Sequence, residues 1–545
     1  MSLIAHIQAS VIGEGQLIET PFGQKPLVYA DYTASGRSLS FIEDFIQQSV
    51  LPWYANTHTE TSFTGRQTTA LREQARAQIR SALNGEAQHK VIFSGSGATA
   101  AIDKLIGILN LRLPADLNER YQLDEVIPED QRPVVFIGPY EHHSNELLWR
   151  ESIATLVTIP LDKHGQIDQA VLAAQLECYQ DRSLKIGSFS AASNVSGIKS
   201  DVTGITALLH QYGALAFWDY AAAGPYVAID LQREQQDAVF ISPHKFVGGP
   251  GTPGVLVVRD AVLNNRVPAV PGGGTVMYVT PEDHLFTSDA ERREEGGTPA
   301  IVESIRAGLV FQLQQQVGAK QIEVLEHAFI ERALARWSAH PSIQILGDTD
   351  QPRLSICSFQ VLHQSKPLHY GFVVALLNDL FGIQARGGCS CAGPYGHSLL
   401  GMDMPYSKAL EARLVAGEMV MRPGWTRMNF NYFIDEPTFE YLLSAVELIA
   451  DQGWRLLPFY EFDASAGVWC YQGRRTALPV SLSDALSFKP CESETVAAVE
   501  YTERLSQAGQ ELMRDRSSEL RYELALAADS QSLCWFRLPQ EVSFS

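Results

Sequence analysis

The sequence predicts an α/β protein, with a large domain built on a mainly parallel β-sheet and a smaller α+β domain after it. Between Lys90 and Val258, short β-branched or aromatic runs alternate with helix-compatible stretches, a pattern typical of a parallel sheet covered by helices. A long helical stretch follows Pro299, and strands and helices mix again from about Pro352 to about Leu448. This second mixture predicts the smaller domain.

At 545 residues, the chain exceeds what one hydrophobic core usually organises, so two or three domains are expected. The expected parts are an N-terminal segment packing with the small domain at residues 1–30, the large domain at 31–300, the small domain at 301–450 and an additional region at 451–545. An amphipathic stretch from about Glu494 and a closing aromatic run, CWFRL, predict that this last region is folded. The sequence assigns it no role.

Composition narrows the expected partners and compartment. The 42 Lys and Arg against 62 Asp and Glu give a net charge of -20, which repels nucleic acid and anionic membrane surfaces. The start of the chain lacks a basic segment and an unbroken apolar run, and no later stretch is long enough to cross a bilayer. Seven cysteines in a chain of this length fit reduced thiols better than a disulfide framework. We therefore expect a cytoplasmic protein that binds neither nucleic acid nor membranes.

Two helices are expected before the sheet. Ser40 to Glu43 matches a capping box, and Thr69 to Leu83 has apolar residues and Arg/Glu pairs at helical spacing. The sheet itself is predicted from six runs, VIF, VVFI, KIGSFS, ALAFW, AVFIS and VLVV. In such sheets ligands bind beyond the carboxyl ends of the strands.

Polar residues end or follow five of these runs. They are the Ser94 to Thr99 loop, His142 with His143, Asn194, Asp219, and His244 with Lys245. The sequence therefore predicts a ligand site at one rim of the sheet.

Lys245 and Asp219 identify the expected ligand. Lys245 has an apolar neighbour in Phe246, and partial desolvation favours a neutral amine that can attack an aldehyde. Asp219 ends the preceding strand, and a carboxylate beneath a pyridine nitrogen keeps that nitrogen protonated. Together they predict pyridoxal 5'-phosphate (PLP), held by Lys245 as a Schiff base. The alternatives are a lysine whose ammonium reaches water and an aspartate that caps a helix or turn.

The neighbouring residues fit the rest of such a cofactor. The loop that enters a helix at Ala98 directs backbone N–H groups toward an anion, although small residues are common in any tight turn. Ser242 and His244 can add donors to the same phosphate. His142 can stack on the cofactor ring and pass protons, or it can be a structural histidine.

A glycine-rich loop in the second domain contains Arg386, Cys389 and Cys391. A loop cysteine near an arginine can be exposed and reactive, which suits a nucleophile. Zinc is the competing interpretation, with His397 nearby, but the C-x-C spacing is short and no second cysteine pair completes a tetrahedral site. No metal is therefore expected. Arg427 can bind a substrate carboxylate.

The chain resembles the class V aminotransferases, a family of fold-type I PLP enzymes, and within it the cysteine desulfurases and selenocysteine lyases. The resemblance runs from about Val28 to about Leu448. Its motifs are VYADYTASG, EHHSN, SNVSG, FWDYAAAG, SPHKFVGGPGTPGVLV, EEGGTPAI and RGGCSCA. It implies a seven-stranded sheet in the large domain.

Carried over residue by residue, the resemblance implies that Lys245 binds PLP and that Asp219 pairs with its ring nitrogen. His142 would stack on the ring and Asn194 would lie near its phenolic oxygen. The phosphate contacts would be Gly97, Ala98, Thr99, Ser242 and His244.

The resemblance also implies a homodimer, because Thr298 matches a threonine that reaches the partner's cofactor. Arg427, with Arg386, would bind the substrate. Cys391 matches the cysteine that accepts sulfur as a persulfide, and a sulfur-acceptor protein is a possible partner. Two departures stand out: the G-C-x-C form of the loop is similar to that of molybdenum cofactor sulfurases, and Ala222 replaces a glutamine that commonly follows the cofactor aspartate.

The sequence thus predicts a PLP-dependent cysteine desulfurase-like enzyme. It would remove sulfur from L-cysteine, or selenium from selenocysteine, with Lys245, Cys391 and His142 as catalytic residues. One alternative is an aminotransferase, lyase or epimerase of the same family in which Cys391 is a bystander. The other is a non-catalytic scaffold, against which the presence of both Lys245 and Asp219 argues.

Overall fold

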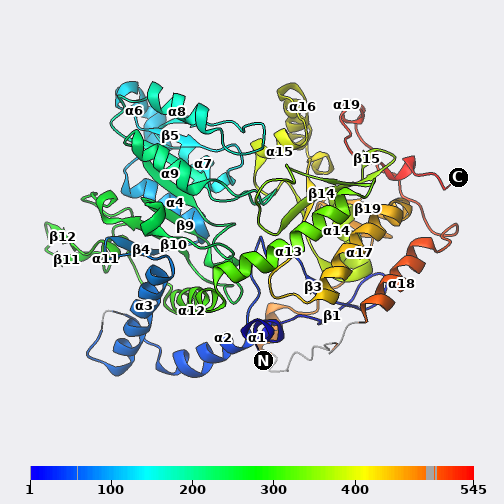
Figure 1. Cartoon of the computed structure of the whole chain (residues 1–545), viewed down its shortest axis with the longest axis horizontal. Coiled ribbons are helices and arrows are strands. Elements are labelled where there is room, and N and C mark those ends of the chain that lie inside the picture. Colours follow the sequence, from blue (N-terminus) through cyan, green and yellow to red (C-terminus); the bar gives the residue numbers. More distant parts are fainter. Residues whose placement is uncertain (1, 58, 487–495, 497–499, 545) are drawn as a thin grey trace. The chain divides into compact units, whose positions relative to one another are not determined.

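The computed structural model describes residues 2–57, 59–486, 496 and 500–544. The chain forms two compact units (Figure 1). Unit 1 comprises Met1–Ile12, Tyr32–Leu325 and Asp350–Leu354, and unit 2 comprises Gly13–Asp31, Glu326–Thr349 and Ser355–Ser545. The domain boundaries expected from the sequence, near residues 30, 300 and 450, stay a prediction.

Unit 1 is built on a seven-stranded sheet in the order β4-β10-β9-β8-β7-β5-β6. The strands are β4 His89–Ser94, β5 Val134–Ile137, β6 Thr155–Thr158, β7 Lys185–Ser190, β8 Leu215–Asp219, β9 Ala238–Ile241 and β10 Gly254–Arg259. Only β10 runs against its neighbours β4 and β9, so the mainly parallel sheet predicted from the sequence is confirmed. Every residue of β5, β7 and β9 is buried, as expected for strands covered on both faces.

The helices of unit 1 lie along this sheet and extend beyond it (Figure 1). They are α1 Leu3–Ser10, α2 Ser40–Phe45, α3 Phe63–Ala82, α4 Gly97–Ile108, α5 Ala115–Tyr121, α6 Leu123–Val126, α7 Leu147–Arg150, α8 Gln169–Cys178, α9 Val202–Gln211, α10 Leu231–Glu234, α11 Ala290–Glu294 and α12 Ile301–Val317. A hairpin of β11 (Val276–Val279) and β12 (His284–Phe286) projects from the unit. Helix α13 (Ala319–Ser338) contributes residues to both units.

The capping box expected at Ser40 is wrong. The N-cap of α2 is Leu39, which makes no side-chain capping bond, and Ser40 is already inside the helix. Glu43, the other member of the expected box, instead pairs with Arg306 of α12. A long-range ion pair therefore replaced the local capping bond that the spacing suggested.

Unit 2 contains a five-stranded sheet and small two-stranded pairs. Its strands are β1 Leu17–Ile18, β2 Lys25–Pro26, β3 Val28–Tyr29, β13 Ile343–Ile345, β14 Ile356–His363, β15 Lys366–Pro367, β16 Ile383–Gln384, β17 Arg386–Gly388, β18 Trp425–Asn429, β19 Tyr460–Asp463 and β20 Val468–Tyr471. Its helices are α14 Tyr370–Phe381, α15 Gly393–Leu399, α16 Met404–Val415, α17 Glu436–Gln452, α18 Tyr501–Met513 and α19 Ala528–Gln531.

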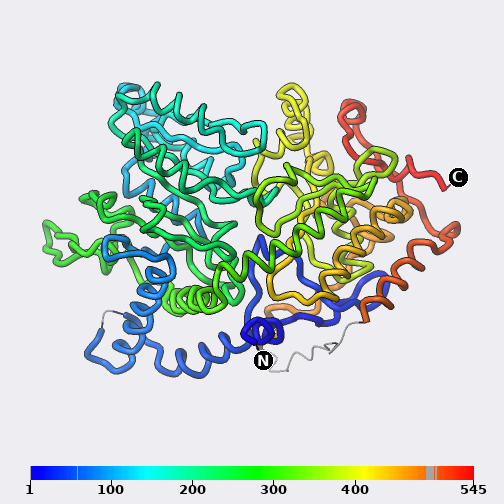
Figure 2. The backbone as a smooth tube through the Cα atoms, viewed as in Figure 1, coloured from blue at the N-terminus to red at the C-terminus, as the bar shows by residue number. Residues whose placement is uncertain are grey.

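The C-terminal region belongs to the core of unit 2. Trp469, Leu512, Phe536 and Val542 are buried in the same apolar cluster as the residues of α14 and α17. Figure 2 shows α18, in orange-red, beside the blue N-terminal segment of this unit, where Arg504 bonds the carbonyl of Gln24. The start of the amphipathic stretch expected near Glu494 lies outside the described residues, and the rest forms α18.

Among the residues that the structure describes, none of the helices combines the length and the apolar character that crossing a membrane requires.

Candidate active site

The carboxyl ends of β4, β8 and β9 lie at one edge of the unit 1 sheet, because all three run antiparallel to β10 or parallel to a strand that does. Ser94 ends β4 and Asp219 ends β8. Lys245 lies in a short 3-10 turn, Pro243–Lys245, directly after β9. The structure therefore brings together the rim residues that the sequence predicted.

Asp219 and Lys245 interact electrostatically within this rim. The Asp219 carboxyl is only 4% exposed, and burial raises its pKa against two opposing effects, a hydrogen bond from the Ala221 N–H and the positive charge of Lys245. The Ala221 nitrogen lies 2.7 Å from Asp219 Oδ1. A buried acceptor beside a lysine amine fits a ligand with both an aldehyde and a protonated ring nitrogen, as PLP has.

The turn between β4 and α4 brings together the residues that the sequence predicted to bind a phosphate. Gly97 has φ +58°, and a Cβ added there would lie 2.9 Å from His244 Cε1 and 3.0 Å from Ser242 Oγ. Glycine is therefore required for the loop to approach these side chains so closely. The Ala98 N–H donates to Ser242 Oγ over 2.9 Å. Gly97, Ala98, Ser242 and His244 thus converge at the N-terminus of α4, a favourable place for a phosphate.

A cavity of about 710 Å³ opens beside this turn, lined in part by residues 93–97 and by His244. Burial and the charge of Lys245 lower the pKa of His244 to about 4. His244 is therefore neutral near pH 7 and can donate one N–H without adding charge.

Thr99 and His142 are connected through Ser144, which sequence reasoning missed. Thr99 Oγ1 lies 2.6 Å from Ser144 Oγ, and His142 Nδ1 lies 3.0 Å from the same hydroxyl. The Ser144 N–H donates to His142 Nδ1 over 3.1 Å, so the neutral imidazole carries its proton on Nε2. The only signal in the sequence was the position of Ser144 in the EHHSN motif.

Glu141 is a second residue that sequence reasoning missed. It is buried between β5 and β7, where its carboxylate accepts hydrogen bonds from Ser190 N (3.0 Å), Ser190 Oγ (2.6 Å) and Asn145 Nδ2 (2.7 Å). Burial raises the pKa of Glu141 to about 7 despite these bonds. The contacts fix the turn that precedes His142. Asn194 is buried in the loop after β7.

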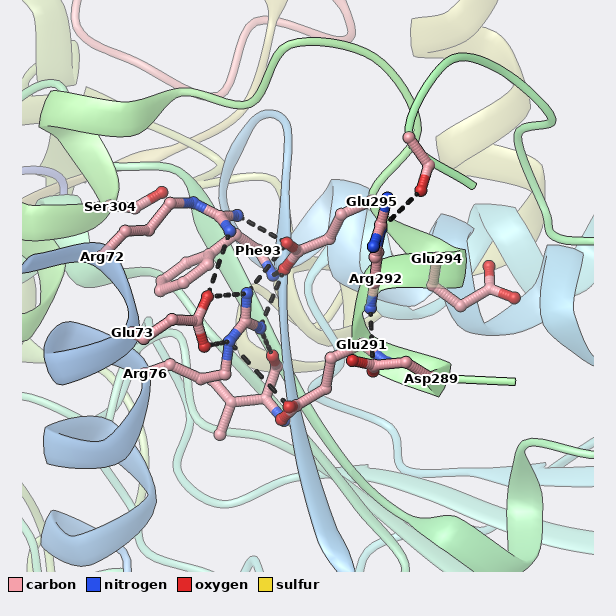
Figure 3. Close-up of polar contacts among 12 residues, drawn as sticks. Arg72, Glu73, Arg76, Phe93, Asp289, Glu291, Arg292, Glu294, Glu295 and Ser304 are labelled. Carbon is pink, nitrogen blue, oxygen red and sulfur yellow. Dashed lines mark hydrogen bonds and ion pairs between the residues drawn. The ribbon is translucent and has the colours of Figure 1, made fainter. Parts of the chain in front are cut away.

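The segment that leads to Thr298 is anchored by a buried charged cluster (Figure 3). Glu295 binds Arg72 at 2.5 Å and Arg76 at 3.0 Å, and its Oε1 accepts the Phe93 N–H at 2.7 Å. Burial alone would lower the pKa of Arg76, but the nearby carboxylates raise it above its usual value. The cluster joins α3, β4 and the segment after α11. Thr298 is exposed and its hydroxyl accepts a bond from Asn56.

Unit 2 holds the predicted substrate arginines. Arg386 and Arg427 are paired directly across β17 and β18. Asp31, which sequence reasoning missed although it lies in the VYADYTASG motif, binds Arg427 at 3.0 Å and Arg386 at 3.2 Å. Two guanidinium groups therefore share one carboxylate, which leaves net positive charge suited to a substrate carboxylate.

The cysteine loop follows β17. Cys391 is exposed and Cys389 is partly buried. Ser390 and Cys391 have φ angles of 52° and 55°, in the left-handed region that residues with side chains seldom adopt. The predicted site residues thus form two sets, one in each unit.

A mainly parallel seven-stranded sheet with a lysine and a buried aspartate at its rim defines the fold-type I class of PLP-dependent enzymes. The profile of the family described as Aminotransferase class-V matches residues 28–415. The chain belongs to the class-V aminotransferase family, whose members use PLP.

Relatives in this family are cysteine desulfurases. The chain is 30% identical over 381 residues to a cysteine desulfurase of Synechococcus elongatus, covering 68% of this chain and 55% of that protein. It is 26% identical over 376 residues to a cysteine desulfurase of Escherichia coli O127:H6, covering 68% and 85%. The apo structure of the cysteine desulfurase from Thermococcus onnurineus NA1 superposes with a TM-score of 0.63 at 20% identity, covering 78% and 95%, and supports the fold.

Proposed function

We propose that the protein is a PLP-dependent cysteine desulfurase. It takes sulfur from L-cysteine, or selenium from selenocysteine, and leaves alanine and a persulfide on Cys391. The observation that carries this proposal is the buried Asp219 carboxyl, whose pKa burial raises while the charge of Lys245 acts in the opposite direction. That pair meets the two chemical requirements of PLP, and relatives named cysteine desulfurase give the reaction.

Each part of the site has a role toward the cofactor. Lys245 Nζ would hold PLP and Asp219 would accept from its ring nitrogen, while His142 would face the ring and Asn194 its phenolic oxygen. The phosphate is bound by Gly97, Ala98, Thr99, Ser242 and His244. PLP, when bound, supplies an electron-withdrawing ring that stabilises negative charge at the substrate α-carbon.

The other residues act on the substrate. Arg427, with Arg386, binds the substrate carboxylate, and Lys245 Nζ removes the α-proton. The Cys391 thiolate then attacks the substrate sulfur: a sulfur–sulfur bond forms, the carbon–sulfur bond breaks and its electron pair stays with the substrate carbon. Protonation of that β-carbon and return of the α-proton by Lys245 give alanine, and Cys391 keeps the sulfur as a persulfide.

The expected assembly is a homodimer in which Thr298 reaches the partner's cofactor. The hairpin of β11 and β12 supports it, because Met277, Tyr278 and Leu285 are 63%, 68% and 58% exposed, and such apolar patches are typical of interfaces.

An amino-acid substrate and a protein that accepts sulfur are the other expected partners. Nucleic acid and membranes are not expected as partners, because the net charge of -20 repels anionic surfaces. We also propose a cytoplasmic location, from the few cysteines.

A Cys391→Ser variant tests the sulfur transfer. Purified protein with PLP is given L-cysteine and a reductant, and alanine and sulfide are measured. We expect the variant to lose both products while keeping the PLP absorbance, and a Cys178→Ser control, at an exposed cysteine that ends α8, to retain them. Unchanged turnover in Cys391→Ser would favour an aminotransferase, lyase or epimerase in which Cys391 takes no part.

Adding PLP to the Lys245→Ala variant separates the enzyme from a scaffold. We expect the wild-type protein to gain a visible absorbance band that the variant lacks. The absence of a band in both proteins would favour the non-catalytic scaffold.

A further inference from the structure

Tyr370, the first residue of α14, supports the base of the cysteine loop in unit 2. A Cβ added to Gly387 would lie 2.7 Å from Tyr370 Cδ2, and one added to Gly424 would lie 2.8 Å from Tyr370 Cε1. Gly387 belongs to β17, which leads into Cys389, and Gly424 precedes β18. The tyrosine ring therefore packs against both backbones, an approach that only glycine allows.

The closing segment of the chain, defined here as residues 533–538, holds this tyrosine in place. The Trp535 ring is nearly parallel to the Tyr370 ring, with centroids 6.1 Å apart and planes at 9°. It also stacks on His369, with centroids 5.4 Å apart. The Trp535 Nε1–H donates to the Met421 carbonyl over 3.0 Å, so both the position and the tilt of the indole are fixed.

The closing segment also bonds α16, a helix that follows the loop in sequence. The Tyr406 hydroxyl of α16 donates to the Leu533 carbonyl over 2.9 Å. Helix α15, which starts two residues after Cys391, joins α16 through His397 Nδ1 and Ser407 Oγ, 3.2 Å apart. The helix that follows the loop is thus linked to the closing segment through α16.

The segment is itself firmly attached to unit 2. The Arg537 N–H donates to the Pro367 carbonyl over 2.8 Å, and Arg537 Nη2 donates to the His363 carbonyl over 3.0 Å. Phe536 is fully buried. These contacts tie it to the β14–β15 hairpin, so it can act as a rigid support.

The loop needs such support. Ser390 and Cys391 have φ angles of 52° and 55°, and a conformation that residues with side chains disfavour persists only when its surroundings impose it. The match to the family ends at residue 415, so the closing segment is a feature of this chain beyond that match.

We propose that the closing segment positions the cysteine loop, with Trp535 as a positioning residue that acts through Tyr370. The segment gives the additional C-terminal region a role in the reaction: it keeps Cys391 in the one loop conformation from which it accepts sulfur. The catalytic part of this inference rests on the proposed function, whereas the structural part does not.

Hydrogen–deuterium exchange with PLP-loaded full-length protein tests the support directly. We expect Trp535→Ala to speed exchange of the peptide covering residues 386–392 about tenfold. Trp535→Phe, which keeps a stacking ring, should restore slow exchange. Tyr501→Ala is the matched control, because Tyr501 is another aromatic residue of the C-terminal region, with its ring centroid 4.4 Å from that of Tyr441, and it should leave the peptide unchanged.

Kinetics then separate positioning from a general loss of structure. Trp535→Ala should lower kcat for alanine formation about tenfold with KM for cysteine within about twofold, and Tyr501→Ala should alter neither. If Trp535→Ala does not fold, Tyr406→Phe takes its place in the experiment. This variant removes only the hydroxyl that donates to the Leu533 carbonyl and should speed the same exchange by a smaller factor.

Unchanged exchange in the folded Trp535 variant, or an equal rise in Tyr501→Ala, would overturn the proposal. Faster exchange with unchanged kcat would also overturn the claim that the segment positions Cys391. If exchange responds as expected but the wild-type protein forms no alanine from cysteine, the proposed function fails while the structural support stands.

Discussion

The rim of unit 1 and the cysteine loop of unit 2 hold their reactive groups in opposite ways. At the rim, Asp219 is buried and Lys245 is half-buried. Neighbouring polar groups, such as the Ala221 N–H and Ser242 Oγ, have defined hydrogen-bond partners. In the loop, Cys391 is exposed and its backbone has a positive φ. A cofactor that stays bound needs a buried, preorganised site, whereas a cysteine that passes sulfur onward has to be reached from outside.

The contacts that hold the two regions in place also differ. In unit 1, buried ion pairs of Glu295 with Arg72 and Arg76 fix the segment leading to Thr298. Stacked rings of Trp535 and Tyr370 support the loop. Removing one partner of a buried ion pair is costly because the other charge stays buried without a partner. A ring contact can be weakened gradually, by replacing the ring with a smaller one. The comparison therefore predicts steep losses at the rim and graded losses in the loop.

Replacing Asp219 should give the largest effect. Asp219→Asn keeps the shape of the side chain but removes the carboxylate that we propose stabilises charge on the cofactor ring, so alanine formation should fall about 100-fold to 1,000-fold. The measurement is the rate of alanine release at saturating PLP. Asp168→Asn, a helix N-cap of α8, should stay active, since asparagine caps as well. Near-normal activity in Asp219→Asn would contradict the assigned role.

Breaking the buried cluster tests the support of the rim. Glu295→Gln leaves Arg72 and Arg76 without their shared carboxylate and should lower the free energy of unfolding by about 3–5 kcal/mol, measured by urea denaturation. Glu73→Gln is the control, because the Glu73 side chain is 54% exposed and should cost below about 1 kcal/mol. Equal losses in the two variants would mean that burial does not set the strength of this cluster.

His369 should make unit 2 sensitive to acid. Burial lowers its pKa from 6.5 to about 3, while Nδ1 accepts the Trp469 indole N–H. Above pH 6.5 both the folded and unfolded forms are neutral. As the pH falls from 6.5 toward 3, only the unfolded form binds the proton, so stability is lost, on the order of a few kcal/mol. Urea denaturation between pH 7 and pH 4 should show this slope, and His369→Asn should flatten it. An unchanged slope in the variant would assign the acid sensitivity to other groups.

Asp31 should have the smallest effect. Asp31→Asn removes the negative charge shared by Arg386 and Arg427, so a substrate carboxylate meets more positive charge. KM for cysteine should then fall by a factor of about three to five, which corresponds to roughly 1 kcal/mol. Arg386→Gln added to Asp31→Asn should bring KM back up. A higher KM in Asp31→Asn alone would show that Asp31 orients the arginines more than it competes for them.

The sequence predicted the parts of the fold and site that depend on local patterns. The six apolar runs became strands, and Lys245 and Asp219 could be chosen because reactive residue types stand at strand ends. The edge strand β6, with three half-buried residues and one exposed, was missed because TLVT lacks a strong apolar pattern.

Residues whose roles depend on partners distant in the sequence could not be predicted either. Glu141 meets Ser190 and Asp31 meets Arg427 only once the chain has folded. The capping box expected at Ser40 is wrong for the same reason, because Glu43 pairs with the distant Arg306. Likewise, nothing in the run CWFRL indicated that Trp535 would stack on Tyr370.

The most direct test of the account is the site of cofactor attachment. Holoprotein is prepared with excess PLP, reduced with borohydride and digested, and the peptides are analysed by mass spectrometry. We predict a pyridoxyl group on Lys245. A group on another lysine, or none at all, would contradict the account.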